Sequence, residues 1–363
     1  MRTRCLSIHA GYRCRHSGAC CHAAWEIEVE PHIIEAVGAR RLIPLSSVAT
    51  PFVPSLEDAG MLLARDGDGW CGFRRDERCS LQSSGGEAML PSACRHFPRV
   101  FLRDARGTMV TLSHYCPTAA ALLLDSTPVT IVDAAPPLAL AEPIEGLDAR
   151  EALPPLVRPG LLADIQGYAA WEGAALAQFA TAPSVTVALA RIATATERVR
   201  EWTPSRGRLA DAVVGAFGPT VICSDAASDA LSEGFGAIRE VTGPHPLLAV
   251  DADFPAAWKV LESESGDLLH RPLANYMAAC TFGNWTAYRG QGVRTVVAWL
   301  QGCYDVLRLQ LVRHARKAGR IDRDVLIESF RMADFITVHT VPSLEFGRTA
   351  SVFEHVAPRL RRH

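Results

Sequence analysis

The chain has 363 residues, of which 48% are apolar and 21% are charged, as in a globular protein large enough for two domains of ordinary size. Its 37 basic and 39 acidic residues nearly cancel, so the charge balance gives no indication of a surface for polyanions or of an acidic substrate. We therefore expect no nucleic acid among the partners.

The N-terminal segment, residues 1–16, begins with arginines but lacks the apolar stretch that a secretory signal requires. The most apolar later segment, residues 119–141, is interrupted by aspartates at 125 and 133 and by prolines. It therefore cannot supply the roughly 20 consecutive apolar residues that span a bilayer. We expect a cytoplasmic protein with no membrane segment.

Cysteines are concentrated near the start of the chain. Eight of the eleven lie in the first 116 residues, where an even distribution would place about 3.5. A reducing cytosol does not normally allow structural disulfides, so metal ligation explains the excess better. We expect Cys5 to be a spare thiol in a loose terminus, and Cys223, Cys280 and Cys303 to be ordinary core or surface residues.

The remaining seven cysteines form two blocks. Cys14 is followed by the adjacent Cys20 and Cys21, and Gly18 between them lets the loop fold back so that several thiolates can converge. The second block is spread over a longer, turn-rich stretch. The predicted metal ligands are Cys14, Cys20, Cys21, Cys71, Cys79, Cys94 and Cys116.

Four thiolates complete either a tetrahedral zinc site or a cubane iron–sulfur cluster, and the spacing does not distinguish the two. Three of the seven cysteines are then left over. They could form an incomplete second site, supply a redox-active thiol, or pack as small hydrophobic residues. Histidines beside the cysteines are each better explained as structural residues than as ligands; these are His16, His22, His96 and His114.

Two hairpins are predicted in the same region. Residues 61–73 bend at Asp66–Gly69, and residues 99–116 bend at Asp104–Gly107. The apolar run 128–132 could add a strand. We expect residues 1–135 to form a small, irregular metal-binding domain with short strands, of the kind that often needs a metal to complete its core.

Residues 136–159 are rich in proline, which disfavours continuous helix, and we place the inter-domain connection there. Residues 160–363 are predicted to be all-helical, so the fold class is α+β. Ser184 is a candidate N-cap, and Gly319 is placed to end the clearest helix. The expected helices cover 160–180, 184–202, 293–318, 322–340 and 349–356.

The motifs resemble a known family. The run CxxxGxCC, the later Cys94-Arg-His-Phe-Pro98 and Cys116-Pro-Thr-Ala-Ala120 are similar to the zinc- or iron-chelating cysteine-cluster proteins of the YkgJ type. They are most similar to the longer, FliB-like flagellin lysine-N-methylases. Leu273–Tyr276 is a weaker point of similarity, and for Asn275 a hydrogen-bonded helix position is the simpler interpretation. Ser17 departs from the shorter pattern, which has a cysteine there; a hydroxyl is a poor ligand for a soft metal.

The resemblance implies an iron–sulfur cluster, with four irons and four sulfides favoured over zinc. It also implies an enzyme that transfers methyl from S-adenosylmethionine to lysine, with flagellin or another protein as substrate. The chain has neither GxGxxG after a predicted strand nor CxxxCxxC. A non-enzymatic metal module that stabilises the fold or binds a partner is the alternative, and electron transfer is a weaker third.

Overall fold

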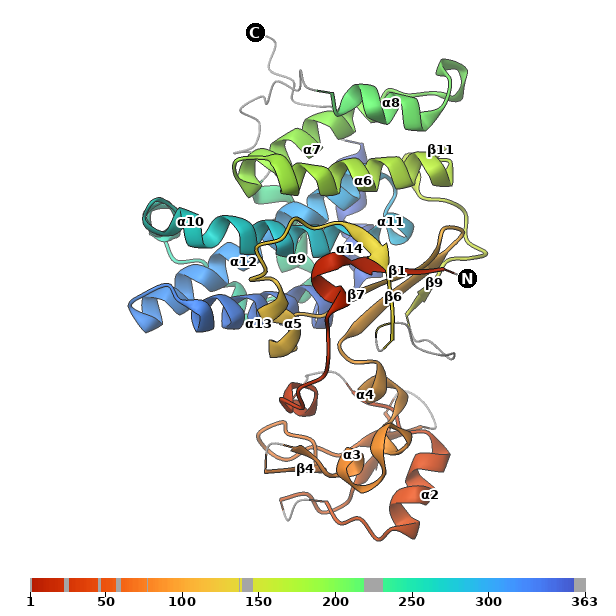
Figure 1. Cartoon of the computed structure of the whole chain (residues 1–363), viewed down its shortest axis with the longest axis vertical. Coiled ribbons are helices and arrows are strands. Elements are labelled where there is room, and N and C mark those ends of the chain that lie inside the picture. Colours follow the sequence, from red (N-terminus) through yellow and green to blue (C-terminus); the bar gives the residue numbers. More distant parts are fainter. Residues whose placement is uncertain are drawn as a thin grey trace.

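The computed structural model describes residues 2–22, 26–44, 47–56, 60–76, 78–136, 138, 146–218 and 231–355. Short elements, including α2, α3, α4 and β4, form a group at one end of the molecule (Figure 1). Long helices occupy the other end, and a sheet lies beside them. The predicted α+β class is confirmed, with the C-terminal part mainly helical. Among the described residues, no helix is long and apolar enough to cross a membrane.

The largest sheet has five strands in the order β8-β1-β7-β6-β9. Its centre is the predicted hairpin of β6 and β7, in which Asp104 lies opposite Gly107 at the turn. Strand β1 pairs with β7 in parallel and with β8 in antiparallel orientation. The strands are β1 (Thr3–Leu6), β6 (Arg99–Asp104), β7 (Gly107–Leu112), β8 (Ile131–Asp133) and β9 (Leu147–Asp148).

We call the described residues between 19 and 96 the cysteine lobe. Its own apolar cluster includes Ile33, Phe73 and Leu81. Its elements are η1 (Ala19–His22), α2 (Pro31–Ala39), β2 (Phe52–Pro54), β3 (Met61–Leu63), β4 (Arg74–Arg75), β5 (Arg78–Cys79), α3 (Ser80–Gly85), η2 (Gly86–Met89) and α4 (Ser92–His96).

The hairpin predicted over 61–73 differs from the observed pairing. Strand β3 pairs with β2, and only a single bridge, Arg65 to Cys71, joins the two sides of the expected turn. The Asp66 carboxylate accepts hydrogen bonds from the backbone N–H groups of Asp68 and Trp70. These local bonds make a compact loop in place of the second strand.

The helices begin and end where short-range chemistry predicts. The Ser184 hydroxyl accepts a hydrogen bond from the Val187 N–H as the N-cap of α7, and α12 ends at Gly319 with φ of 70°. Helix α6 starts at Ile165 rather than 160 because the Asp164 carboxylate caps it. The final helix, expected over 349–356, is instead α14 followed by η6.

The remaining elements include a 28-residue helix, α10, that contains Pro272. They are α1 (Ser7–Ala10), α5 (Pro117–Leu122), β10 (Leu156–Arg158), β11 (Leu161–Leu162), α6 (Ile165–Thr181), α7 (Val185–Arg200), η3 (Pro204–Arg206), α8 (Leu209–Ala216), α9 (Leu231–Thr242), η5 (Pro246–Leu248), α10 (Phe254–Thr281), α11 (Thr286–Arg289), α12 (Val293–Ala318), α13 (Arg323–His339), α14 (Ser343–Thr349) and η6 (Ala350–Glu354).

The sheet and the helices share one hydrophobic core. Leu6, Leu102 and Met109 belong to the same apolar cluster as the buried faces of α6, α10 and α12. The Asn275 side chain on α10 donates hydrogen bonds to the carbonyl groups of Leu123 and Asp125, after α5. The division into 1–135, 136–159 and 160–363 stays a prediction about folding units. The shared core and the Asn275 hydrogen bonds join residues of the first segment to residues of the third.

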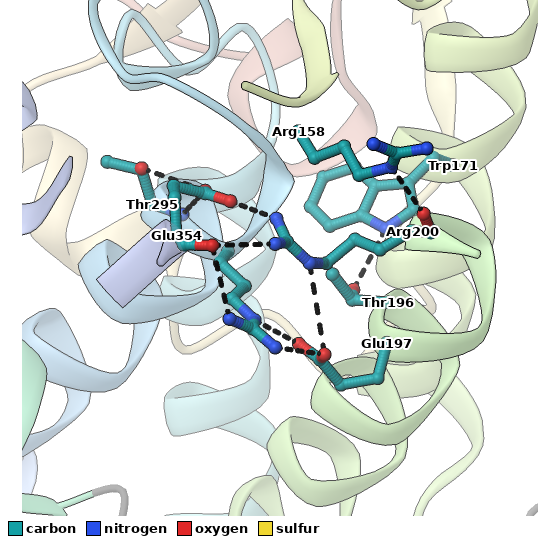
Figure 2. Close-up of polar contacts among 8 residues, drawn as sticks. Arg158, Trp171, Thr196, Glu197, Arg200, Thr295 and Glu354 are labelled. Carbon is teal, nitrogen blue, oxygen red and sulfur yellow. Dashed lines mark hydrogen bonds and ion pairs between the residues drawn. The ribbon is translucent and has the colours of Figure 1, made fainter. Parts of the chain in front are cut away.

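The buried carboxylate of Glu354, in η6, is hydrogen-bonded to the start of α12. Glu354 accepts hydrogen bonds from the Thr295 backbone N–H and hydroxyl, at 2.8 and 3.0 Å, and pairs with Arg200 of α7 (Figure 2). Glu197 pairs with Arg294 at 2.5 Å and approaches Arg200 at 3.8 Å. A negative charge at this helix N-terminus also suits the helix dipole.

Helices α9 and α12 cross with their backbones in contact. A Cβ atom at Gly234 would lie 2.0 Å from the Ala298 carbonyl oxygen and 2.8 Å from the Gly302 nitrogen. Because both neighbours are backbone atoms, the clash could be relieved only by moving a helix.

We therefore expect Gly234→Ala to lower the free energy of unfolding by about 1–3 kcal/mol. The matched control is Gly236→Ala on the same helix, where a Cβ meets nothing within 4 Å. This control should be neutral, or more stable by about 0.5–1 kcal/mol, because alanine favours helix. Urea denaturation of both variants measures the difference, and equal stability would contradict the close crossing.

Asp305 on α12 provides a pH prediction. Burial raises the pKa of this carboxyl to about 7, although Arg308, 3.2 Å away, opposes the shift. An acid whose folded pKa exceeds its unfolded value makes folding less favourable as the pH rises between the two values. Asp305→Asn should therefore gain stability relative to the native chain from pH 4 to 8, on the order of a few kcal/mol.

In the Asp305→Asn variant Arg308 loses its ion-pair partner, which changes the free energy of unfolding by an amount that does not depend on pH. The diagnostic quantity is thus the change in the stability difference with pH, measured by urea denaturation at several pH values. A difference that stays constant from pH 4 to 8 would show that Asp305 remains ionised throughout.

Candidate metal centre

Three separated segments bring four cysteines together in the cysteine lobe. Cys20 and Cys21 lie on η1, which follows a turn at Gly18, where φ is 71°. The Cys71 N–H donates a hydrogen bond of 2.7 Å to the Cys21 carbonyl, which joins the second segment to the first. Cys79 ends β5, immediately before α3.

The side chains of these four residues contact one another around Cys21. Hydrogen bonds with the Cys21 thiol lower the pKa of Cys20, of Cys71 and of Cys79, the last to about 6. The same bonds raise the pKa of Cys21 itself. These hydrogen bonds place the side chains of Cys20, Cys71 and Cys79 beside the Cys21 sulfur.

Backbone donors also point at two of the sulfur atoms. The Cys71 thiolate is stabilised by the Phe73 N–H, and the Cys79 thiolate by the N–H groups of Leu81 and Gln82. N–H groups directed at cysteine sulfur are among the contacts that tune thiolate-bound metal centres. Local backbone geometry thus favours negative charge at these positions.

Cys94 on α4 faces the same group. Burial raises the pKa of its thiol, and the charges of Cys20, Cys71 and Cys79 raise it further. We call these five residues the thiol cluster: Cys20, Cys21, Cys71, Cys79 and Cys94. Arg65, whose guanidinium donates to the carbonyl groups of Cys21 and Gly69, opposes the shift at Cys94. Arg65 has no motif around it, so the sequence did not indicate this role.

The other two predicted ligands lie apart from the thiol cluster. Cys116 is buried at the N-terminus of α5, 3.9 Å from the Tyr12 hydroxyl. Cys14 is exposed and accepts a hydrogen bond from the His16 N–H. Burial raises the pKa of Cys116, and the Cys14 thiolate adds to the effect, which makes these two residues neighbours. The seven candidates therefore divide into five and two.

The remaining cysteines have different surroundings. The expectation that Cys5 lies in a loose terminus is wrong, because β1 pairs on both sides and buries this thiol in the sheet. Cys280 and Cys303 lie on α10 and α12, far along the chain from the lobe. Cys223 lies outside the described residues. Ser17, at the position of the missing cysteine, is exposed.

Two histidines beside the cysteines have other partners. His22 approaches the Asp68 carbonyl oxygen at 3.1 Å, and its ring packs on Trp70. His16 contacts the Gln82 side chain at 3.0 Å, which places the Cys14 loop beside α3. Within the described ranges, no three or more His, Cys, Asp or Glu side chains are already arranged to hold a metal ion.

In comparisons with known proteins, no protein-family model, curated protein or solved structure matches the chain. The family resemblance therefore stays a prediction that rests on the cysteine motifs. Four cysteine side chains lie together at Cys21. Sulfur is the ligand type that soft metals prefer, and four is the ligand number of zinc and iron–sulfur sites.

Proposed function

We propose that the cysteine lobe holds a metal centre on Cys20, Cys21, Cys71 and Cys79. The observation that carries the proposal is the meeting of thiols from three chain segments at the Cys21 sulfur. Four thiolates match the ligand number of both zinc and cubane iron–sulfur sites. Binding would release protons from the thiols, since only thiolates ligate a metal.

We propose an iron–sulfur cluster, with four irons and four sulfides, in preference to zinc. The thiolate set serves both, and the resemblance to the cysteine-cluster family is what favours iron and sulfide. In this proposal Cys94 covers the centre from one side, while Cys14 and Cys116 are not ligands. The Arg65 guanidinium beside Cys21 would offset part of the negative charge of four thiolates.

Metal removal by substitution tests this assignment. After anaerobic purification we expect about four irons and four sulfides per chain. Cys71→Ser and Cys79→Ser should each lose most of the metal, because a hydroxyl is a poor soft-metal ligand. The matched control is Cys14→Ser, which changes an exposed cysteine outside the thiol cluster and should keep the full content.

Zinc at one per chain without sulfide would contradict the iron–sulfur assignment and leave the site in place. Loss of metal in Cys14→Ser but not in Cys71→Ser would contradict the site itself. Elemental analysis and the visible absorption of the cluster report these outcomes.

We further propose that the protein is an enzyme that methylates lysine side chains of a protein, with flagellin as the first candidate substrate. The support is the similarity of the cysteine motifs to flagellin lysine-N-methylases. In such a reaction the neutral amine nitrogen bonds to the methyl carbon of S-adenosylmethionine as the carbon–sulfur bond breaks. The thioether leaves with the electron pair, and the amine proton passes to a base or to water.

The methylation test uses protein with a full metal content, S-adenosylmethionine labelled in the methyl group, and purified flagellin. We expect label on flagellin lysine, and a large loss of labelling with Cys71→Ser. The Cys14→Ser control should keep the activity. Metal-replete protein that neither binds the donor nor labels lysine would contradict the enzyme proposal and leave the metal centre standing.

The second candidate function is a non-enzymatic metal module. The specific observation in its favour is that the cysteine lobe has its own apolar cluster, in which Cys21 and Cys71 are buried beside Phe73. Such a small core gains stability from a bound metal. Under this alternative, Cys71→Ser lowers the melting temperature of the lobe, and no methyl transfer occurs in either protein.

A further inference from the structure

A cavity of about 550 Å³ lies outside the thiol cluster, between the β6–β7 hairpin and the helices. This volume lies in the range of small-molecule sites. The walls are rich in aromatic rings: Phe97, Phe101, Phe282, Trp285 and Trp299. The loop between α13 and α14, residues 340–342, supplies a further side.

Arg289, the last residue of α11, lines this cavity. Its guanidinium is half-buried, donates to the Ser343 hydroxyl at 2.5 Å, and lies 5.1 Å from the centre of the Trp285 ring. Throughout the described ranges, no carboxylate forms an ion pair with it. Burial alone lowers its pKa, without a compensating acid.

Two more deeply buried arginines, Arg106 and Arg200, have acidic partners. Arg106 pairs with Asp104 and Glu172, and Arg200 pairs with Glu354. The Arg289 guanidinium is partly exposed, lines the cavity and has no carboxylate partner among the described residues, so it is free to pair with an anion that enters the cavity.

The backbone of Arg289 is held rigidly. A Cβ atom at Gly347 of α14 would lie 2.3 Å from the Arg289 carbonyl oxygen, so the two backbones are in direct contact. A Cβ atom at Gly290 would lie 2.7 Å from the Thr295 side chain of α12. The packed backbone sets where the side chain starts, and the hydrogen bond to Ser343 and the contact with Trp285 position the guanidinium.

The other polar residues that line the cavity include Asp334, His114 and His339, which have partners within the chain. Asp334 accepts a hydrogen bond from the His114 backbone N–H, and the His114 ring nitrogen lies 3.2 Å from the same carboxylate. The His339 ring lies 2.7 Å from the Ser113 hydroxyl, and burial lowers its pKa to about 4, so it is neutral. These residues therefore already pair within the chain, whereas Arg289 has no carboxylate partner among the described residues.

We propose that the cavity binds a small organic oxyanion with an aromatic body, whose negative group pairs with Arg289. The rings pack against the Phe and Trp walls, and two oxygens of a carboxylate or phosphate fit the guanidinium fork. This binding site is independent of the proposed metal centre and of lysine methylation.

The experiment titrates the full-length protein with 8-anilinonaphthalene-1-sulfonate, a fluorescent aromatic anion. We expect one saturable site. Arg289→Gln should weaken binding roughly 10- to 100-fold, because a hydrogen-bonded ion pair is lost. Arg289→Lys, which keeps the charge but not the fork, should weaken it less. The matched control is Arg320→Gln, which removes an exposed arginine outside the cavity and should bind as the native protein does.

A second variant tests the cavity itself. Val338 lines it and is 40% exposed, so Val338→Trp should narrow the cavity without disturbing the core. Thermal melting confirms that each variant is folded. Native-like probe binding by both folded Arg289→Gln and folded Val338→Trp would overturn the proposal.

Competing ligands identify the anionic group. 1-Naphthoate represents carboxylates and 1-naphthyl phosphate represents phosphates. The one that displaces the fluorescent probe at the lower concentration shows which class of anion the cavity prefers. Neutral 1-naphthol should compete at least tenfold less well than the better anion. Equal competition by 1-naphthol would overturn the role of Arg289.

Discussion

The Arg106 guanidinium joins the turn of the β6–β7 hairpin to helix α6, and this buried ion-pair network holds the sheet that lines the cavity against the helices. The guanidinium pairs with Asp104 at 2.8 Å and with Glu172 of α6 at 2.7 Å. Burial disfavours its charge, but the two carboxylates outweigh that effect and raise the pKa of Arg106. The Tyr288 hydroxyl donates to Asp104, and the Gly283 N–H donates to Glu172, so the buried carboxylates are satisfied.

Two of the seven candidate cysteines flank the β6–β7 hairpin in the sequence. Cys94 precedes β6 by five residues, and Cys116 follows β7 by four. Arg99 lies opposite Leu112, so the start of β6 and the end of β7 are both at the end of the hairpin away from its turn. From that end the chain runs back through α4 to Cys94 and forward to Cys116 at the start of α5. The two cysteines nevertheless lie in different groups, with Cys94 against the thiol cluster and Cys116 beside Tyr12.

Local signals predicted the parts of the fold that local chemistry determines. Ser184 and Gly319 mark helix ends through bonds within a few residues, and the 99–112 hairpin follows from its turn. Helix α10 was missed because Pro272 interrupts the pattern, and long helices tolerate proline when neighbours support them. The five-and-two division of the cysteines and the cavity could not be read from the sequence, because both depend on contacts between distant segments.

Helix α4 connects the two sites of the molecule. Cys94 on this helix faces the thiol cluster, whereas Ala93 and His96 line the cavity, together with Phe97 after the helix. With five residues, α4 is little longer than one helical turn, so side chains close together in the sequence reach both sites. The thiol cluster and the cavity therefore share this helix as a structural element, although each is lined by different side chains of it.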